Sequence, residues 1–545
     1  MEVLPDEVLL DVFRHIKNDC DQVKQVCMRF YLLICQLNKS KLCLAISDKQ
    51  LQDPETYDSM VYSKRIFSKM ALNTNNVQSL NSFWKLRTIC SLKAPTITEL
   101  TWDLAKMTST EIVFILNFFS NLKTLKCNSW KIETDYYDEP IDTLQLESLK
   151  FLSIIKCNEA TTSMFINYLP ANSLTKLETD FYSSILISNN SGLNDLNFTV
   201  DEISHDWVPV PLIHLSMRLQ KYRHNNHPVL LSILPQQPNL ISFDVLSCNG
   251  IFDEDDESFI TMCSLKHLKV LKMNIDDINH AVFKENFRKL NQLKELHIES
   301  VDGDYHSLID NIEELSNTRL EHLKILNIDV EHIGIPLNRI EHMGMNFPCL
   351  TNLAYKCERP LPIDIYIRNF RALTDLEINY HYSQEFSLMC SNLDGITYPN
   401  INTIKLKGFN FGSDANFNEP AFSKLVKVVP NISDMEIEVN MPLNTKFLDN
   451  NLQKLSKLKI FKDLTLMQQK ENYEKFDTAC VNYLLSVCEK LDSFTVELKL
   501  NAIDMDVHVM KTMLSAKFKF NMKRLGSQIV IELGVKQANK RTTEN

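Results

Sequence analysis

The sequence predicts an α/β protein: a small helical module at the N-terminus, followed by a long, irregular solenoid of strand–helix repeats. Three observations predict this architecture. The first 46 residues carry apolar side chains at helical spacing. From residue 97 to residue 533 a short apolar triplet returns at a mean interval of about 26 residues, a period typical of repeat proteins. A chain of 545 residues is also longer than a single compact core usually grows.

Composition excludes several classes of function. Apolar residues make up 44% of the chain and charged residues 23%, which are ordinary values for a folded protein. The net charge of −11 disfavours a general nucleic-acid binder, which is usually basic. Only 10 residues are glycine, and the motifs HExxH, GxSxG, GxxxxGK[ST] and GxGxxG are absent. We therefore expect a protein that is not an enzyme, binds no nucleic acid, and needs no cofactor or metal.

The cysteines and the first residues bear on the compartment. Fourteen cysteines are scattered without a CxxC motif or a disulfide-framework spacing. Acidic Glu2 and Asp6 stand where a secretory leader would carry basic and apolar residues. No apolar run is long enough to span a membrane. These features predict a protein of the cytoplasm, the nucleus or both, without a membrane segment.

Residues 1–46 are predicted to form short helices. Pro5 suits the first turn of a helix, and the apolar residues from Val8 to Ile16 then fall on one helical face. A second apolar stripe runs from Val23 to Ile34, and a third short helix is expected at Leu42–Ile46. Roughly 45 residues are close to the lower limit of independent stability, so this module is expected to need a partner.

The module resembles an F-box. The resemblance is carried by Leu4-Pro5-Asp6-Glu7-Val8-Leu9, Val12-Phe13, Ile16 and Val26-Cys27-Met28-Arg29-Phe30. One residue of the family pattern is missing before Val26, which shortens the loop between the helices. The resemblance implies docking on a Skp-family adaptor through Leu4, Pro5, Leu9, Val12, Phe13, Ile16, Val26, Cys27 and Phe30. The alternative is an ordinary amphipathic helical hairpin.

The repeat is a triplet of the form apolar-x-x-apolar-x-apolar. Its last two apolar residues alternate with polar ones, as in a half-buried strand. Segments with helical spacing, such as 109–119 and 280–290, lie between the triplets. The sixteen triplets begin at Ile97, Leu122, Leu149, Leu174, Leu193, Leu212, Leu240, Leu268, Leu293, Leu323, Leu350, Leu373, Ile401, Ile432, Phe461 and Leu491. Each unit reads as strand, turn, helix and turn, and stacked units bury one another's apolar sides.

These units resemble leucine-rich repeats. In that family an Asn or Cys follows the triplet by three residues and satisfies backbone groups at the turn. Cys157 and Cys248 occupy this position, whereas Trp130, Asp276 and Val301 do not fit it. We therefore expect irregular or water-filled turns where the Asn or Cys is missing.

Boundaries follow from where the triplets begin and end. Residues 1–46 form the F-box-like module, and residues 47–96, without a clear triplet, are expected to be a connector and N-terminal cap. The solenoid of about 16 units covers residues 97–533, and the polar residues 534–545 are expected to be a disordered tail. The basic stretch from Lys517 to Arg524 is expected to be a capping element.

Variable positions next to the second and third apolar residues are expected to line the open strand face. From residue 295 onward these positions lean acidic, with a lysine interruption at 405–407. The candidate substrate-binding residues are Glu295, His297, Glu299, Asp329, Asp375, Glu377, Lys405 and Lys407. Charge complementarity favours a protein segment with exposed basic residues as the ligand. The alternative is that these charges only keep the repeats soluble.

An F-box followed by leucine-rich repeats resembles the substrate receptors of Skp–cullin–F-box ubiquitin ligases. That resemblance implies a receptor that binds the adaptor by its N-terminal helices, and through it the cullin and RING subunits. The solenoid would hold an unknown protein substrate, and the chain would contribute no catalytic residue. A competing interpretation is a non-catalytic repeat scaffold whose F-box is degenerate; the missing residue before Val26 favours it.

Overall fold

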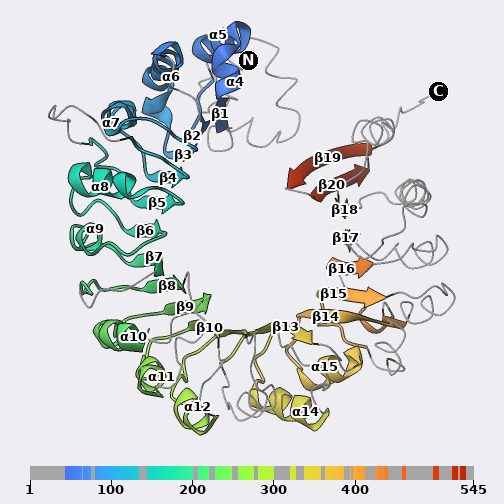
Figure 1. The fold of residues 1–545 in the computed structure, drawn as a ribbon. Coiled ribbons are helices and arrows are strands. Elements are labelled where there is room, and N and C mark those ends of the chain that lie inside the picture. The colour runs from blue at the N-terminus through green and yellow to red at the C-terminus, as the bar shows by residue number, and fades with distance from the viewer. Residues whose placement is uncertain are drawn as a thin grey trace, which may run out of the picture. The chain divides into compact units, whose positions relative to one another are not determined.

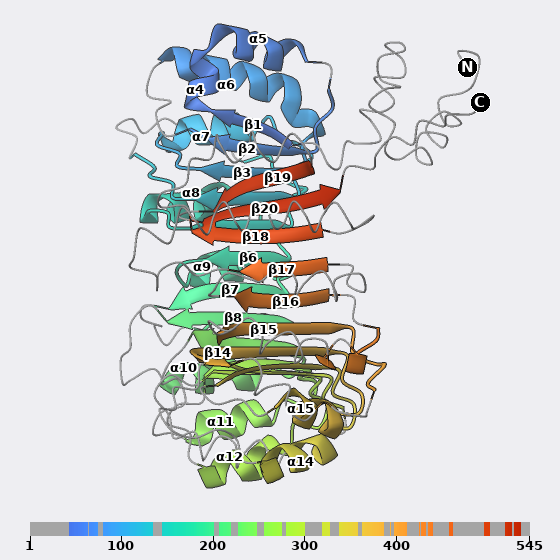
Figure 2. The same ribbon diagram turned by 90° about the vertical axis from the view of Figure 1, so that its right-hand side faces the viewer.

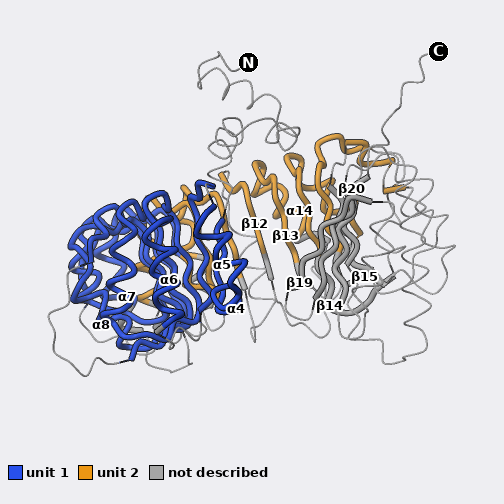
Figure 3. The backbone as a smooth tube through the Cα atoms, turned by 90° about the horizontal axis from the view of Figure 1, so that it is seen from above, with its two compact units in different colours: residues 1–243 blue, residues 244–545 orange. Residues whose placement is uncertain are grey.

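A computed structural model provides the structure of this chain. It describes residues 43–63, 65–74, 80–133, 144–200, 207–219, 227–247, 256–274, 280–299, 319–326, 337–357, 362–385, 393, 397–410, 424–425, 427–431, 434–439, 457–461, 495–501, 518–525 and 528–535. The F-box-like residues 1–42 therefore lie outside the described residues. The chain divides into two units, residues 1–243 and residues 244–545, coloured separately in Figure 3.

Unit 1 is built on a ladder of parallel strands in chain order. Its strands are β1 (Cys43–Ser47), β2 (Lys69–Asn73), β3 (Glu99–Asp103), β4 (Thr124–Asn128), β5 (Phe151–Ile155), β6 (Lys176–Thr179), β7 (Asp195–Val200) and β8 (His214–Leu219). Each strand pairs with the next in a constant register, so that Leu100, Leu125, Leu152 and Leu177 lie side by side. These leucines are all buried. The alternation of buried and half-exposed residues is the period of two that a one-sided strand requires.

Helices of unit 1 lie on one side of its ladder. They are α4 (Asp48–Gln52), α5 (Pro54–Tyr62), α6 (Leu80–Lys93), α7 (Ser109–Leu116), α8 (Glu159–Tyr168), α9 (Ser184–Ser188) and α10 (His227–Ile233), with short 3-10 turns at Ala94–Thr96 and Leu234–Gln236. Figure 1 shows these helices along the outer side of the strands. Thr108 caps α7 through a capping box with Glu111. None of the helices that the structure describes in unit 1 lies on the other face of the ladder (Figure 1).

Unit 2 repeats this plan. Its helices are α11 (Asp256–Cys263), α12 (His280–Phe287), α14 (Leu337–Asn346) and α15 (Ile363–Asn369). Strand β9 (Ser242–Ser247) crosses the boundary between the units. The strands after it are β10 (Val270–Asn274), β11 (Glu295–Glu299), β12 (His322–Leu326), β13 (Asn352–Cys357), β14 (Asp375–Glu385), β15 (Thr403–Asn410), β16 (Asp434–Val439), β17 (Lys457–Phe461) and β18 (Thr495–Asn501). From β10 to β18 each strand pairs in parallel with the next.

An antiparallel hairpin ends the ladder of unit 2. Strand β20 (Gln528–Val535) pairs antiparallel with β18, and β19 (Phe518–Leu525) pairs antiparallel with β20, as Figure 2 shows. The capping element predicted at Lys517–Arg524 is therefore strand β19. The predicted tail begins too early, because Gly534 pairs with Thr495 inside the sheet.

The ladder also begins earlier than the sequence predicts. The helix expected at Leu42–Ile46 is strand β1, and β2 lies within the expected connector. Leu44 and Ile46 are buried and alternate with exposed or half-exposed neighbours, which is a strand pattern. Five residues are too few to separate a helix period from a strand period by sequence. Tertiary pairing with β2 decides the outcome.

Three repeats lie in a different register from the predicted one. Leu323 pairs with Leu296, so the triplet of β12 begins at the buried Leu320 rather than at Leu323. Strand β17 begins at Lys457, before the triplet predicted at Phe461. In β18 Val496 takes the second apolar position instead of the third, because it pairs with Leu458. The segment Leu320-x-x-Leu323-x-x-Leu326 fits the pattern in two frames, and only the neighbouring strands select one.

Turns after β3, β4 and β5 share one backbone geometry. Leu104, Ser129 and Lys156 each follow the last residue of their apolar triplet by two positions and have φ of 62°, 58° and 55°. The N–H of Leu104 donates to the carbonyl of Asn128, and that of Ser129 to the carbonyl of Ile155, both at 2.8 Å. These hydrogen bonds join each turn to the end of the next strand. They compensate the free-energy cost of the left-handed backbone conformation.

Trp130 takes over the role of the missing Asn or Cys. Its indole N–H donates to the carbonyl of Trp102 at 2.7 Å, and the Trp102 indole donates to Thr74 Oγ1 at 3.0 Å. Cys157 lies at the same position in the next repeat. Its Sγ accepts a hydrogen bond from the backbone N–H of Trp130 at 3.4 Å and donates one to the backbone carbonyl of Cys127 at 3.5 Å. The expectation of an irregular or water-filled turn is wrong here, since the indole supplies the donor.

Candidate protein-binding face

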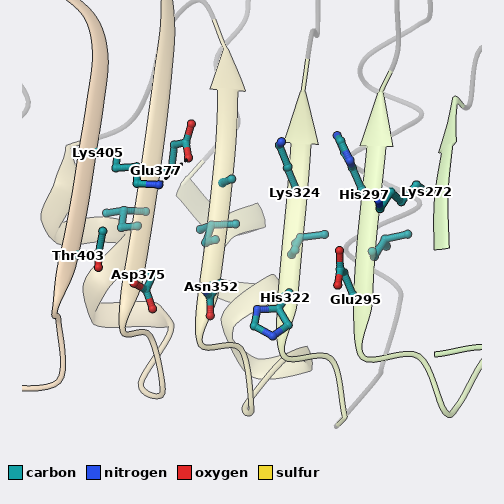
Figure 4. A pocket seen from close by; sticks show the side chains of 15 residues that line it. Lys272, Glu295, His297, His322, Lys324, Asn352, Asp375, Glu377, Thr403 and Lys405 are labelled. Atoms are coloured by element: carbon teal, nitrogen blue, oxygen red, sulfur yellow. Dashed lines mark ion pairs between the residues drawn. The ribbon is translucent and has the colours of Figure 1, made fainter. Parts of the chain in front are cut away.

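Strand residues that point away from the core of unit 2 form two rows across β10–β15. They are aligned by the parallel register, which places equivalent positions of neighbouring strands side by side. The first row is Glu295, His322, Asn352, Asp375 and Thr403. The second row is Lys272, His297, Lys324, Ala354, Glu377 and Lys405. Figure 4 shows both rows on the same side of the strands.

The two rows line a hollow of about 390 Å³. Leu296, Leu323, Leu353 and Leu376 also line it, and each of them is at most 3% exposed. Ala354 has the shortest side chain of the second row and lies between Lys324 and Glu377 in the register. The lack of a long side chain at this position leaves room in the middle of the hollow.

Charges around the hollow are balanced rather than acidic. Three lysines and three carboxylates are among the lining residues. From residue 295 onward the lining residues still include more carboxylates than lysines, but the register of β12 adds Lys324, which the sequence pattern does not place on this face. Lys272 Nζ lies 3.2 Å from Asp244 Oδ2, and Lys405 Nζ lies 3.8 Å from Glu377 Oε2. Lys324 and Glu295 form no ion pair with another described residue.

His297 is the most unusual member of the second row. The residue is 8% exposed, and its Nε2 has no hydrogen-bond partner among the described residues. Burial, together with the positive charges of Lys324 and Lys272, lowers the pKa of His297 to about 4. The imidazole is therefore neutral near pH 7. A buried polar atom left without a partner costs about 1–3 kcal/mol.

The structure brings together five of the eight predicted substrate-binding residues. Glu295, His297, Asp375, Glu377 and Lys405 all line the hollow. Glu299 lies in β11 and Lys407 lies in β15, and the structure describes only the backbone of these two residues. Asp329 lies outside the described residues. The predicted adaptor-binding residues, from Leu4 to Phe30, lie outside them as well.

Sequence reasoning missed His322 and Lys324. A triplet that begins at Leu323 places Asp329 on the face of this repeat instead. The register pairs His322 with Glu295 and Lys324 with His297. A signal was present, since the interval from Leu293 to Leu320 is closer to the mean repeat length than that to Leu323.

The equivalent face of unit 1 satisfies its own charges. Lys69 pairs with Glu99 at 2.6 Å, and Lys176 pairs with Asp195 at 2.7 Å. Glu178 accepts hydrogen bonds from Ser153 at 3.1 Å and from Asn197 at 3.2 Å. The ammonium groups of Lys126 and Lys176 lie 5.8 Å and 5.3 Å from the centre of the Phe151 ring. The hollow of unit 2 differs because several of its polar groups have no such compensation.

Comparisons with known proteins give no family for this chain. No family model matches it, and no curated protein matches it. Solved structures that match this chain include a protein from Bacteroides fragilis, with 17% identity over 46% of this chain and 72% of that chain and a TM-score of 0.29. They include a complex of Rad7 and Elc1 in yeast, with 12% identity over 85% and 91% and a TM-score of 0.27. A TLR13–ssRNA13 complex shows 15% identity over 73% and 57%, with a TM-score of 0.33.

These likenesses are too low to carry an argument, so the assignment of a leucine-rich-repeat-like ladder rests on this chain's own strand register. Two further features of the described residues bear on function. Among them, no helix is long and apolar enough to cross a membrane. The described ranges also hold no group of three or more His, Cys, Asp or Glu side chains that could bind a metal ion.

Proposed function

We propose that this chain is a non-catalytic receptor that holds a protein partner on the strand face of unit 2. The observation that carries this proposal is the hollow across β10–β15, with a buried His297 and with Lys324, which forms no ion pair with any residue that the structure describes. Polar groups that lack compensation within the fold gain most from a partner that supplies it.

The dimensions of the face favour a protein segment over a metabolite. A volume of about 390 Å³ is near the lower end of small-molecule pockets, which are also mostly apolar. The lining residues come from six neighbouring strands, and at a spacing of about 4.8 Å these span roughly 25 Å. A surface of this length and charge suits a peptide segment that places several side chains along it.

The F-box-like pattern of residues 1–46 adds a second role to the proposal. It supports docking on a Skp-family adaptor through Leu9, Phe13 and the other matched residues. In this arrangement the chain is the substrate-recognition subunit of a Skp–cullin–F-box ubiquitin ligase. Ubiquitin transfer belongs to other subunits, and the receptor acts by raising the effective concentration of its substrate near them. The compartment that goes with this role is the cytoplasm, the nucleus or both.

One alternative is retained because of a specific sequence feature. The residue missing before Val26 shortens the loop between two predicted helices. A module altered in this way would leave a repeat scaffold that tethers its partner without recruiting the adaptor.

Co-purification of the full chain with a Skp-family adaptor distinguishes the ubiquitin-ligase receptor from the scaffold. We expect a stable complex with the wild-type chain and its loss in the double variant Leu9→Asp/Phe13→Asp, because charged residues on the apolar face of the first predicted helix would oppose docking. Circular dichroism of the variant shows whether the repeats remain folded. A folded wild-type chain that forms no complex would leave the scaffold as the remaining interpretation.

A further inference from the structure

Negative charge is in deficit at one point of the unit 2 hollow. Lys272, His297 and Lys324 are neighbours in the second row, on β10, β11 and β12. Strand spacing places the two lysines roughly 10 Å apart with the imidazole between them. Asp244 is paired with Lys272 at 3.2 Å, while Lys324 has no ion pair or hydrogen bond among the described residues. In Figure 4 the two lysines flank His297.

The remaining carboxylates of the hollow do not compensate this deficit. Glu377 lies next to Lys405, with 3.8 Å between Oε2 and Nζ, and Asp375 accepts a hydrogen bond from Thr374 Oγ1 at 2.6 Å. Glu295 belongs to the first row, where its register neighbour is His322. No acidic residue stands in the second row between β10 and β13.

We propose that Lys272, His297 and Lys324 form the subsite for an oxyanion, a carboxylate or a phosphate, on the peptide segment that the receptor binds. Among the described residues, the ammonium group of Lys324 forms no ion pair and the Nε2 of the buried His297 imidazole has no hydrogen-bond partner. A bound oxyanion would satisfy both groups at once. This inference rests on the proposed function, since it assigns the chemistry of the partner held on the same face.

The subsite has a defined response to pH. The charged groups that act on His297 are Lys324 and Lys272 on the neighbouring strands and Asp244 from β9. Glu295 lies two residues before His297 on the same strand and therefore faces the same side. The two lysines lower its pKa, and an oxyanion between them opposes that effect. An opposite charge within a few ångströms raises a histidine pKa by about 1–3 units. Binding then takes up a proton, so affinity increases as pH falls from 7 to 5, by about twofold for a shift of one unit and by about fortyfold for a shift of three units.

The test uses the full chain and three short synthetic peptides as probes. One peptide carries Asp and Glu, one carries phosphoserine, and one carries Lys and Arg, each in a Gly-rich, end-capped frame. NMR of the imidazole groups reports the binding, and His297→Gln identifies the resonance of His297. We expect the acidic or the phosphorylated peptide to shift this resonance and to raise the pKa of His297, and the basic peptide to leave it unchanged.

Variants connect the signal to the subsite. Lys324→Gln should weaken binding of the oxyanion peptide about tenfold, as expected for one lost charged contact. Lys126→Gln is the matched control, because Lys126 holds the equivalent middle position of strand β4 in unit 1. The responses of the two oxyanion peptides tell a carboxylate from a phosphate.

Three outcomes would overturn the inference. They are the absence of any shift with both oxyanion peptides, an equal response of the Lys324→Gln chain, and preferential binding of the basic peptide. Preferential binding of the basic peptide would indicate that Glu295 and Asp375 of the first row bind the partner instead. These signals do not depend on the adaptor, so a failed adaptor complex and a failed subsite remain distinguishable.

Discussion

At the scale of single residues, Trp130 shows how this chain departs from the usual repeat pattern. The indole is fully buried and lies edge-on against Trp102, with 5.2 Å between ring centroids. Its N–H takes the place of the donor that Asn supplies in leucine-rich repeats. A sequence pattern written in residue types misses this substitution, because the donor arrives from a larger ring in a different direction.

Replacing Trp130 by Phe should destabilise the turns around it. The substitution removes the donor to the buried Trp102 carbonyl and leaves a small void, and we expect a loss of about 2 kcal/mol. Hydrogen exchange of the amides in β3–β5 measures this loss locally. Trp84→Phe is the control, since Trp84 is 47% exposed, and it should change exchange little. Equal effects of the two variants would contradict the role assigned to the buried indole.

Residue burial could be predicted only in part. The leucines of the triplets are buried as their spacing indicates, Leu100 and Leu125 among them. His297 occupies a position that the sequence marks as exposed, yet its residue is 8% exposed. Burial lowers its pKa, and so do the charges of Lys324 and Lys272, which belong to the neighbouring repeats.

At the scale of elements, the spacing of the apolar triplets predicts the order of the strands better than it predicts the residue at which each triplet begins. Ladder order follows directly from the succession of triplets, because stacked repeats contact only their neighbours. Frame errors arise where apolar residues recur every three positions, as at Leu320, Leu323 and Leu326. In β12 the triplet begins three residues earlier than predicted. The face of this repeat therefore carries Lys324 where the sequence predicts Asp329, and the sign of the expected charge is reversed.

Packing between α14 and α15 depends on the absence of a side chain at Gly344. A Cβ built there would lie 2.4 Å from the carbonyl oxygen and 2.8 Å from the carbonyl carbon of Asn369. These are backbone atoms, so the clash is relieved only if one helix moves. No sequence pattern identifies this glycine, because the constraint comes from a helix in the next repeat.

Gly344→Ala should therefore destabilise unit 2. Within an isolated helix the change would be favourable by up to about 1 kcal/mol, but overpacking costs about 1–3 kcal/mol, and we expect the second effect to dominate. Thermal unfolding of the full chain measures the result. Met345→Ala changes a neighbouring residue that is 69% exposed and should have little effect. A stabilised Gly344→Ala chain would show that the two helices separate easily.

At the scale of the whole molecule, we propose that the chain consists of an adaptor-binding module and a ladder of strands that binds the partner. The parallel α/β ladder could be predicted from a mean period of about 26 residues. The place of the binding face could be predicted as well, because alternate strand residues must point away from the helices. The identity of the hollow could not be predicted, since it depends on the register of six strands and on the small side chain of Ala354.

Capture of a protein partner by variants of the full chain tests the central claim most directly. Ala354→Arg fills the middle of the hollow, whereas Ala71→Arg makes the same change at the equivalent position of β2 in unit 1. Quantitative mass spectrometry then compares the proteins that co-purify with each chain. The account predicts that Ala354→Arg loses the partner and keeps the adaptor, while Ala71→Arg keeps both. A partner retained by a folded Ala354→Arg chain would contradict the assignment of the binding face to unit 2.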